Sequence, residues 1–197
     1  MFVSTCSVYA DQSSRAGQLE GAPVLGLLDG MTDPGELYGA RKAAAERIVA
    51  EVYGERALIP RPGHVRDLGA WIADACHRAR SGVFSLAGDP GSFGRFLHDC
   101  EAATYSEAEL AWIPASRLLA AGVEPWMGIP MWIGDPALPG INDVDNSRAA
   151  AAGLACRPAI ETIRDTLAWD LARGGPGEEG LTSAEEERLL RELVSRA

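Results

Sequence analysis

The chain has 197 residues, 47% of them hydrophobic, which is enough for one domain with a sizeable core, alone or with a small second lobe. Its formal net charge of −10 argues against nucleic acid and anionic membrane surfaces as partners, because both require clustered Lys and Arg. The apolar runs are too short to cross a membrane, and Met1 leads into strand-like sequence without a charged leader, so we expect a cytoplasmic protein.

The first predicted element is a strand. The segment from Phe2 to Tyr9 is rich in β-branched and aromatic residues and contains several small hydroxyl residues. This composition predicts a buried parallel strand over residues 2–7. Binding sites in open α/β sheets lie at the carboxyl ends of strands, so the hydroxyl residues are placed where a site would form.

A helix that carries Tyr38 and Lys42 is predicted next, over residues 36–53. A phenol and an ammonium group four residues apart share one helix face. A phenol is a weak base at neutral pH, and a nearby cation favours its phenolate form, so the pair suits a general base. By itself, the Y-x-x-x-K pattern is more often a solvated pair on the outer face of a helix.

Two more strands are predicted, over residues 57–61 and 83–86, and helical connections favour parallel pairing of all three. Further along the chain, apolar periodicity and capping residues predict five more helices. They begin near Asp67, Ser92, Asp145, Pro158 and Ser183. The predicted fold class is therefore α/β, with a mostly helical region following the sheet.

Two segments allow both a structural and a functional interpretation. The G-x-x-G-x-x-G pattern from Gly88 to Gly94 could hold a phosphate, but Pro90 removes an N–H and no acidic residue ends a strand about 20 positions later, which favours a simple turn. Residues 125–136 contain two Trp, two Met and three Pro. They could form a hydrophobic flap over the core or one wall of a substrate pocket.

The four cysteines form no C-x-x-C, and the three histidines form no H-E-x-x-H, so no metal site is predicted. Reduced thiols in the core are expected instead.

The order of these elements resembles that of the extended short-chain dehydrogenases, which include NAD-dependent sugar-nucleotide epimerases, dehydratases and reductases. In that family a strand reading roughly F-V-S-[ST]-x-S-V-Y precedes a long loop and a Y-x-x-x-K helix, as residues 2–9 and 36–44 do here. Residues 57–63, 66–71 and 81–88 are similar to the strand, helix start and strand that follow. Residues 126–136, 143–148 and 161–170 are similar to the substrate-side region of actinobacterial relatives.

The resemblance implies an enzyme that uses NAD or NADP to move a hydride at a hydroxyl-bearing carbon of a small molecule such as a nucleotide sugar. It implies catalytic roles for Thr5, Tyr38 and Lys42. Tyr38 would take the substrate proton, Thr5 would bond the developing carbonyl oxygen, and Lys42 would support the phenolate. Tyr38 and Lys42 would also contact the nicotinamide and its ribose. A homodimer is compatible with the resemblance, because relatives often pair through the Y-x-x-x-K helix.

The sequence also departs from the family. The glycine-rich βαβ unit that grips a dinucleotide needs roughly 30 residues, and the residues before Tyr38 already hold a strand and a long loop. Near residues 63–66, relatives carry a long segment that is here replaced by His64 and Val65. We therefore expect that the N-terminal cofactor-binding half is absent and that this chain does not bind NAD or NADP tightly.

These observations predict a partial Rossmann-like parallel sheet over residues 1–90, the C-terminal part of a catalytic domain. A substrate-side region with terminal helices follows over residues 91–197. Two functional hypotheses remain open. The chain belongs to an oxidoreductase, either as it stands or in a longer form, or it is a shortened and inactive relative that serves as a binding or assembly module.

Overall fold

The computed structural model describes residues 1–13, 18–26, 34–62, 67–88, 91–135, 138, 143–175 and 180–194. The chain forms two compact units. The first contains Met1–Pro90 and Ala137–Arg157, and the second contains Gly91–Pro136 and Pro158–Ala197. Along the chain, the first change of unit comes after residue 90. Residues 137–157, which the sequence placed in the second region, belong instead to the first unit.

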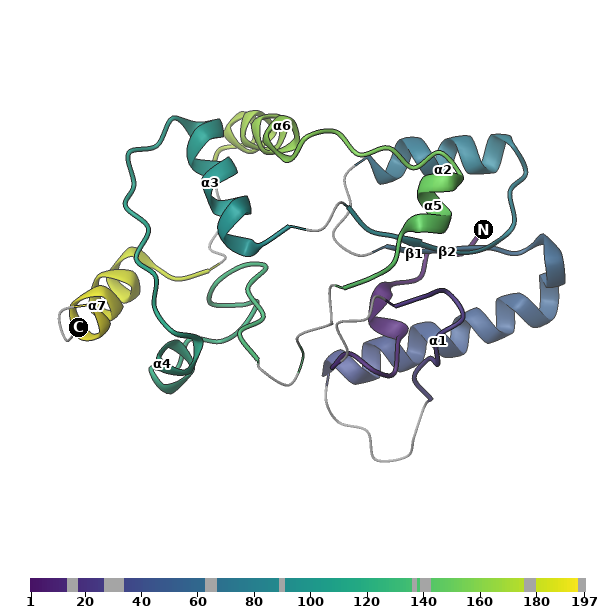
Figure 1. The fold of residues 1–197 in the computed structure, drawn as a ribbon, viewed down its shortest axis with the longest axis horizontal. Coiled ribbons are helices and arrows are strands. Elements are labelled where there is room, and N and C mark those ends of the chain that lie inside the picture. The colour runs from purple at the N-terminus through teal and green to yellow at the C-terminus, as the bar shows by residue number, and fades with distance from the viewer. Residues whose placement is uncertain are drawn as a thin grey trace. The chain divides into compact units, whose positions relative to one another are not determined.

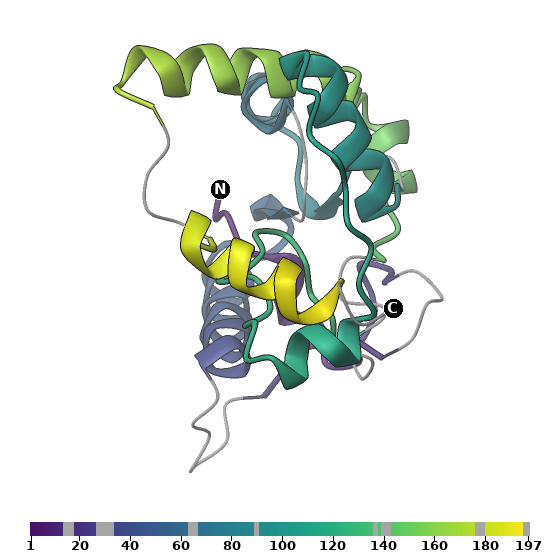
Figure 2. The same cartoon turned by 90° about the vertical axis from the view of Figure 1, so that its left-hand side faces the viewer.

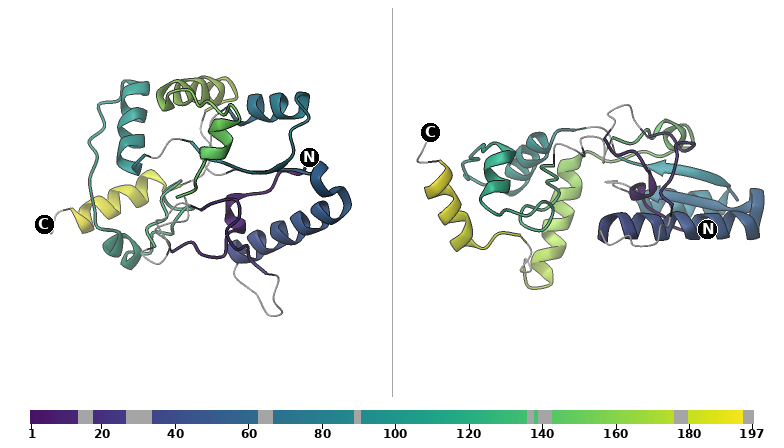
Figure 3. Two further views of the ribbon diagram at one scale, coloured as in Figure 1. Left: turned by 45° about the vertical axis from the view of Figure 1, so that its right-hand side comes forward. Right: turned by 90° about the horizontal axis from the view of Figure 1, so that it is seen from below.

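The first unit is a small parallel sheet with helices. Its elements are η1 (Cys6–Val8), α1 (Pro34–Tyr53), η2 (Gly54–Arg56), β1 (Leu58–Pro62), α2 (Leu68–His77), β2 (Gly82–Leu86) and α5 (Ser147–Ala151). β1 and β2 pair in parallel, with Leu58 opposite Gly82 and Pro62 opposite Leu86. In Figures 1 and 3, α2 and α5 lie on one side of the sheet and α1 on the other. A mixed α/β fold is thus confirmed.

The third predicted strand, residues 2–7, is only partly formed. The Phe2 amide donates to the Leu58 carbonyl at 2.9 Å, and the Ser4 amide donates to the Pro60 carbonyl at 2.8 Å. The segment therefore runs along β1 in the same direction. The prediction of a strand reaching residue 7 is wrong, because the chain turns into η1 immediately after Thr5.

The sequence of β1 explains why this pairing stays incomplete. A parallel ladder requires hydrogen bonds in both directions between its strands. Here the return bonds would come from the amides of residues 60 and 62, and both residues are proline, which has no N–H. The first segment can therefore donate to β1 but cannot accept from it at these positions.

The core of the first unit lies between the sheet and the helices α2 and α5. Trp71 of α2 meets Phe84 of β2 edge to face, with ring centroids 5.2 Å apart. The cluster is completed by Leu58, Ala75, Leu86, Ala149, Ala152 and Leu154. Because three of these residues come from 149–154, the late segment fills part of the core that the early chain leaves open.

Hydrogen bonds also hold the late segment against the first unit. The Trp71 indole donates to the Ala152 carbonyl at 3.3 Å. The backbone amide and Nε of Arg157 both donate to the Asp67 carboxylate, at 2.9 and 2.8 Å. These contacts join residues more than 80 positions apart and explain why 137–157 do not belong to the second unit.

The second unit contains α3 (Phe93–Thr104), α4 (Ala115–Ala120), α6 (Ala159–Ala172) and α7 (Ser183–Leu193). α3 packs against α6, as Figures 1 and 2 show. On α6 the apolar residues Ile160, Ile163 and Leu167 are half-buried, whereas Leu171 is 63% exposed. The apolar stripe of this helix is therefore buried only as far as Leu167. The short helix α4 was not predicted.

Two helix starts are settled by side-chain caps. The Ser92 hydroxyl accepts from the Arg95 amide and begins α3 at the predicted place. At α7 the predicted capping box is wrong by one residue. The cap is Thr182, whose hydroxyl accepts from the Glu185 amide, while the Glu185 carboxylate accepts from the Thr182 amide at 2.8 Å.

The cysteines do not form the set of core thiols that the sequence led us to expect. All four cysteines are free, but Cys76 is exposed and the other three are half-buried. Within the described ranges, no helix combines the length and the apolar character needed to cross a bilayer.

Candidate functional site

The predicted catalytic helix α1 lies directly against the segment that carries Thr5. Gly39 approaches the Ser7 carbonyl so closely that a side chain at this position would overlap it. Ala40 and Ala43 are completely buried beside it. Small residues let the backbone of α1 approach η1, which is seen beside α1 in Figure 1. Lys42, which follows this packed part of α1, lies close to the segment that precedes η1.

Lys42 connects the helix to that segment. Its Nζ donates to the Val3 carbonyl at 3.0 Å and lies 5.2 Å from the centre of the Phe2 ring. The same Nζ is 5.8 Å from the centre of the Tyr38 ring, so the predicted pair shares one face. Lys42 is also the only lysine in a chain whose 18 basic residues are otherwise all arginine. This signal was available in the sequence and strengthens the case for Lys42.

Tyr38 is accessible. Half of its surface is exposed to solvent, so a small molecule could reach the phenol. Sequence reasoning predicts that the phenol faces the Thr5 hydroxyl across the end of the sheet, and this arrangement remains a prediction.

Thr5 is buried at the end of the extended segment, with only 9% of its surface exposed. Its Oγ1 accepts from the Ser7 amide at 3.2 Å and donates to the Ser7 hydroxyl at 3.3 Å, which makes Thr5 the cap of η1. A substrate oxygen would have to replace the Ser7 hydroxyl as the acceptor of this proton. Burial raises the pKa of the adjacent Cys6 thiol, although hydrogen bonds from its own backbone and from Thr5 act in the opposite direction.

A buried ion pair joins α1 to β1, and the sequence reasoning missed it. Arg61 of β1 and Glu46 of α1 are 4% and 5% exposed, and two hydrogen bonds of 3.0 and 2.6 Å join them. Two sequence signals pointed to it. An arginine in the middle of a buried strand needs a partner, and Glu46 follows Tyr38 and Lys42 at intervals of four residues.

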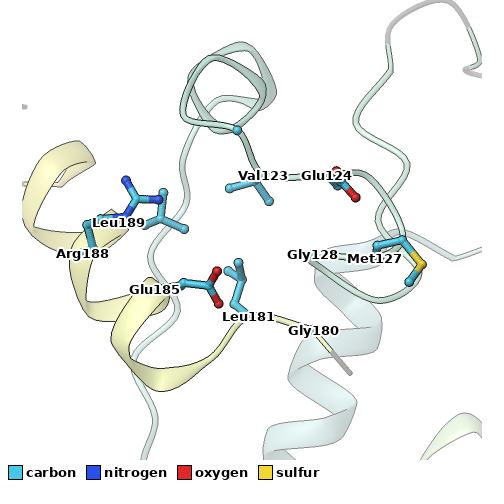
Figure 4. A pocket seen from close by; sticks show the side chains of 10 residues that line it. Val123, Glu124, Met127, Gly128, Gly180, Leu181, Glu185, Arg188 and Leu189 are labelled. Carbon is cyan, nitrogen blue, oxygen red and sulfur yellow. The ribbon is translucent and has the colours of Figure 1, made fainter. Parts of the chain in front are cut away.

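Three other segments were considered for a functional role from the sequence: the residues around His64, the glycine turn and residues 125–136. His64 and Val65 lie outside the described residues, as do Asp89 and Pro90 of the glycine turn. In residues 125–136, Trp126 and Met127 are 49% and 67% exposed, so these two side chains do not close the core. Met127 and Gly128 instead line an open pocket of about 280 Å³ between α7 and the loop that follows α4 (Figure 4).

Among the described residues, no three His, Cys, Asp or Glu side chains gather as ligands for a metal ion. Comparison with protein-family models, with curated proteins and with solved structures found no match for this chain.

Proposed function

We propose that this chain carries the proton-transfer half of an NAD- or NADP-dependent oxidoreductase of the extended short-chain dehydrogenase type. The proposed substrate is a small molecule with a hydroxyl-bearing carbon, such as a nucleotide sugar. The observation that carries the proposal is the position of the Lys42 ammonium. The ammonium is bonded to the carbonyl of Val3, which is two residues before Thr5 in the same segment. It also lies beside the Tyr38 ring.

The donor groups at this position fit a nicotinamide riboside. The Lys42 ammonium has three N–H donors, and its bond to Val3 uses one of them; in the proposal, ribose hydroxyls accept from the others. When bound, the oxidised nicotinamide would accept the hydride.

In this proposal the residues of the chain move the proton. The exposed Tyr38 phenolate takes the proton from the substrate hydroxyl as the carbon is oxidised. The Thr5 hydroxyl turns from Ser7 to the substrate and donates to the oxygen as its carbonyl character develops. Lys42 keeps its bond to the Val3 carbonyl, and this bond holds the Lys42 ammonium beside the Tyr38 phenol.

The test is a turnover assay of the full chain with millimolar NAD or NADP and a panel of nucleotide sugars, followed through the absorbance of the reduced nicotinamide. Tyr38→Phe should lower turnover by about 10²- to 10⁴-fold, the usual effect of removing a general base. Tyr53→Phe is the matched control, because Tyr53 is on the same helix and similarly exposed, and it should leave the rate unchanged. Turnover that Tyr38→Phe does not affect would contradict the role of Tyr38 as the base, and no turnover at all would favour the binding or assembly module.

A further inference from the structure

The buried guanidinium of Arg61 contacts three separate parts of the first unit. It bonds both carboxylate oxygens of Glu46 on α1 and donates to the Glu20 carbonyl at 3.1 Å. Its Cζ also lies 5.0 Å from the centre of the Tyr9 ring. Since Arg61 is itself part of β1, one side chain connects the sheet, the catalytic helix and the residue that follows η1.

The contacts of Arg61 extend to β2. Tyr9 is 1% exposed, and its hydroxyl shares a 2.6 Å hydrogen bond with Ser85 on β2, which is directly opposite Arg61 in the sheet. The Ser85 amide donates to the Glu20 carboxylate at 3.2 Å. The residues that surround Arg61 therefore form one connected polar network. Burial opposes the charge of Arg61, but hydrogen bonding to Glu46 and Tyr9 outweighs it, so the pKa of the guanidinium is raised.

Glu46 is placed to control where Tyr38 and Lys42 lie. The three residues are spaced by four along α1 and follow one another on the same side of the helix. The tightly packed part of α1 consists of Gly39, Ala40 and Ala43, which offer small contact surfaces. Beyond Glu46, the large apolar residues of the helix are exposed: Ile48 by 61%, Val52 by 62% and Tyr53 by 54%. Glu46 is thus a strong polar attachment at the end of the packed region.

We infer that Arg61 is a positioning residue, which holds Lys42 and Tyr38 against residues 3–7 by fixing α1 through Glu46 and the end of η1 through Tyr9. The catalytic meaning of this arrangement rests on the proposed function. The arrangement itself is a property of the fold and can be tested without substrate or cofactor.

The single lysine provides the probe. Protein grown with ¹³C,¹⁵N-lysine gives signals from Lys42 alone. Because Nζ lies near the rings of Phe2 and Tyr38, the ε-methylene resonances should be displaced from those of free lysine by ring currents. The ¹⁵N-indole resonance of Trp71, which is bonded to Ala152, reports separately on the core of the same unit.

Two variants remove the connection in different ways. Glu46→Gln keeps the shape of the side chain and weakens the pair. Arg61→Met combined with Glu46→Leu replaces the pair with apolar side chains, a change that buried ion pairs often tolerate without unfolding. Glu51→Gln and Arg47→Met are matched controls, because both residues are exposed on α1.

In both variants, the ε-methylene resonances of Lys42 should lose the ring-current displacement that comes from Phe2, while the contribution of Tyr38, which is on the same helix, remains and the Trp71 indole resonance stays in place. The two controls should leave both signals unchanged. Lys42 resonances that keep their positions in the folded double variant would overturn the inference. The inference would also be overturned if the Lys42 resonances lost their ring-current displacement in the two control variants. A chain that shows no turnover but responds in this way would contradict the proposed function and still support the role of Arg61.

Discussion

Gly39 of α1 packs directly against the backbone carbonyl of Ser7, and a methyl group in its place would overlap that oxygen and lie 2.8 Å from Leu25 Cδ1. This contact brings the predicted catalytic helix onto the turn that follows Thr5. Gly39→Ala should therefore force the two segments apart and lower the free energy of unfolding by about 1–3 kcal/mol. Urea unfolding measures the change.

Gly69→Ala is the control for this substitution. Gly69 is also helical, in α2, but its added methyl group would have no atom within 4 Å. Alanine should favour the helix there and raise the free energy of unfolding by about 0.5–1 kcal/mol. Equal effects of the two substitutions would contradict the close approach at Gly39.

Removing one partner of the buried ion pair should be costly. Arg61→Leu would leave the Glu46 carboxylate buried without its partner, which lowers the free energy of unfolding by about 3–5 kcal/mol. The combination of Arg61→Met with Glu46→Leu should recover most of this loss, because no unpaired charge remains. Denaturant unfolding of both proteins provides the comparison, and a double variant as unstable as the single one would contradict it.

The capping residue of α7 can be identified by two alanine substitutions. Thr182→Ala removes the hydroxyl that caps the Glu185 amide and should destabilise α7 by about 1 kcal/mol. Ser183→Ala should have little effect. Amide exchange of α7 distinguishes the two, and the opposite ranking would restore the cap expected from the sequence alone.

The same cap should respond to acid. Hydrogen bonds from the Thr182 side chain and backbone lower the pKa of the Glu185 carboxyl. A lowered pKa in the folded state means that the stabilising effect is complete above the ordinary glutamate pKa of about 4.3 and is lost as the pH falls through the folded value. The protection factors of the α7 amides, which are corrected for the intrinsic pH dependence of exchange, should fall over this range. Glu185→Gln should remove that pH dependence.

The thiols should differ in reactivity. Burial raises the pKa of Cys6, so its reactive thiolate should be scarce at pH 8, whereas Cys76 is exposed. Alkylation followed by peptide mass spectrometry should find Cys76 modified before Cys6. Because the folded pKa is raised, Cys6 should also make the fold less stable as the pH rises above about 8.5. Faster alkylation of Cys6 than of Cys76 would contradict this.

The isolated chain should bind NAD and NADP with a millimolar dissociation constant or weaker, equivalent to about 4 kcal/mol. Most affinity for a dinucleotide comes from a pyrophosphate at a helix N-terminus and a ribose on a carboxylate. At α3, the Ser92 hydroxyl already accepts from the Arg95 amide, which occupies one of the free donors at that helix start. Calorimetric titration with each cofactor is the measurement. Saturable micromolar binding would show that the Gly88–Gly94 turn holds a phosphate.

Local sequence determined the parts of this protein that depend on neighbours along the chain. Apolar periodicity located α1, α2, α3 and α6, since a helical face recurs within one or two turns. The spacing of Tyr38 and Lys42 placed the two side chains on one face for the same reason. The two prolines of β1 were also visible, and their missing amides account for the incomplete pairing with residues 2–7.

Tertiary structure alone decided which distant groups meet. The spacing along α1 places Glu46 on the same side as Tyr38 and Lys42, but its pairing with Arg61 is decided only when α1 lies against β1, where both charges are desolvated. The return of residues 149–154 to the core of the first unit depends on Trp71 and Phe84, which are over 60 positions away. The hydroxyl of Thr5 bonds Ser7 because the chain turns there, and a strand pattern does not reveal this local cap.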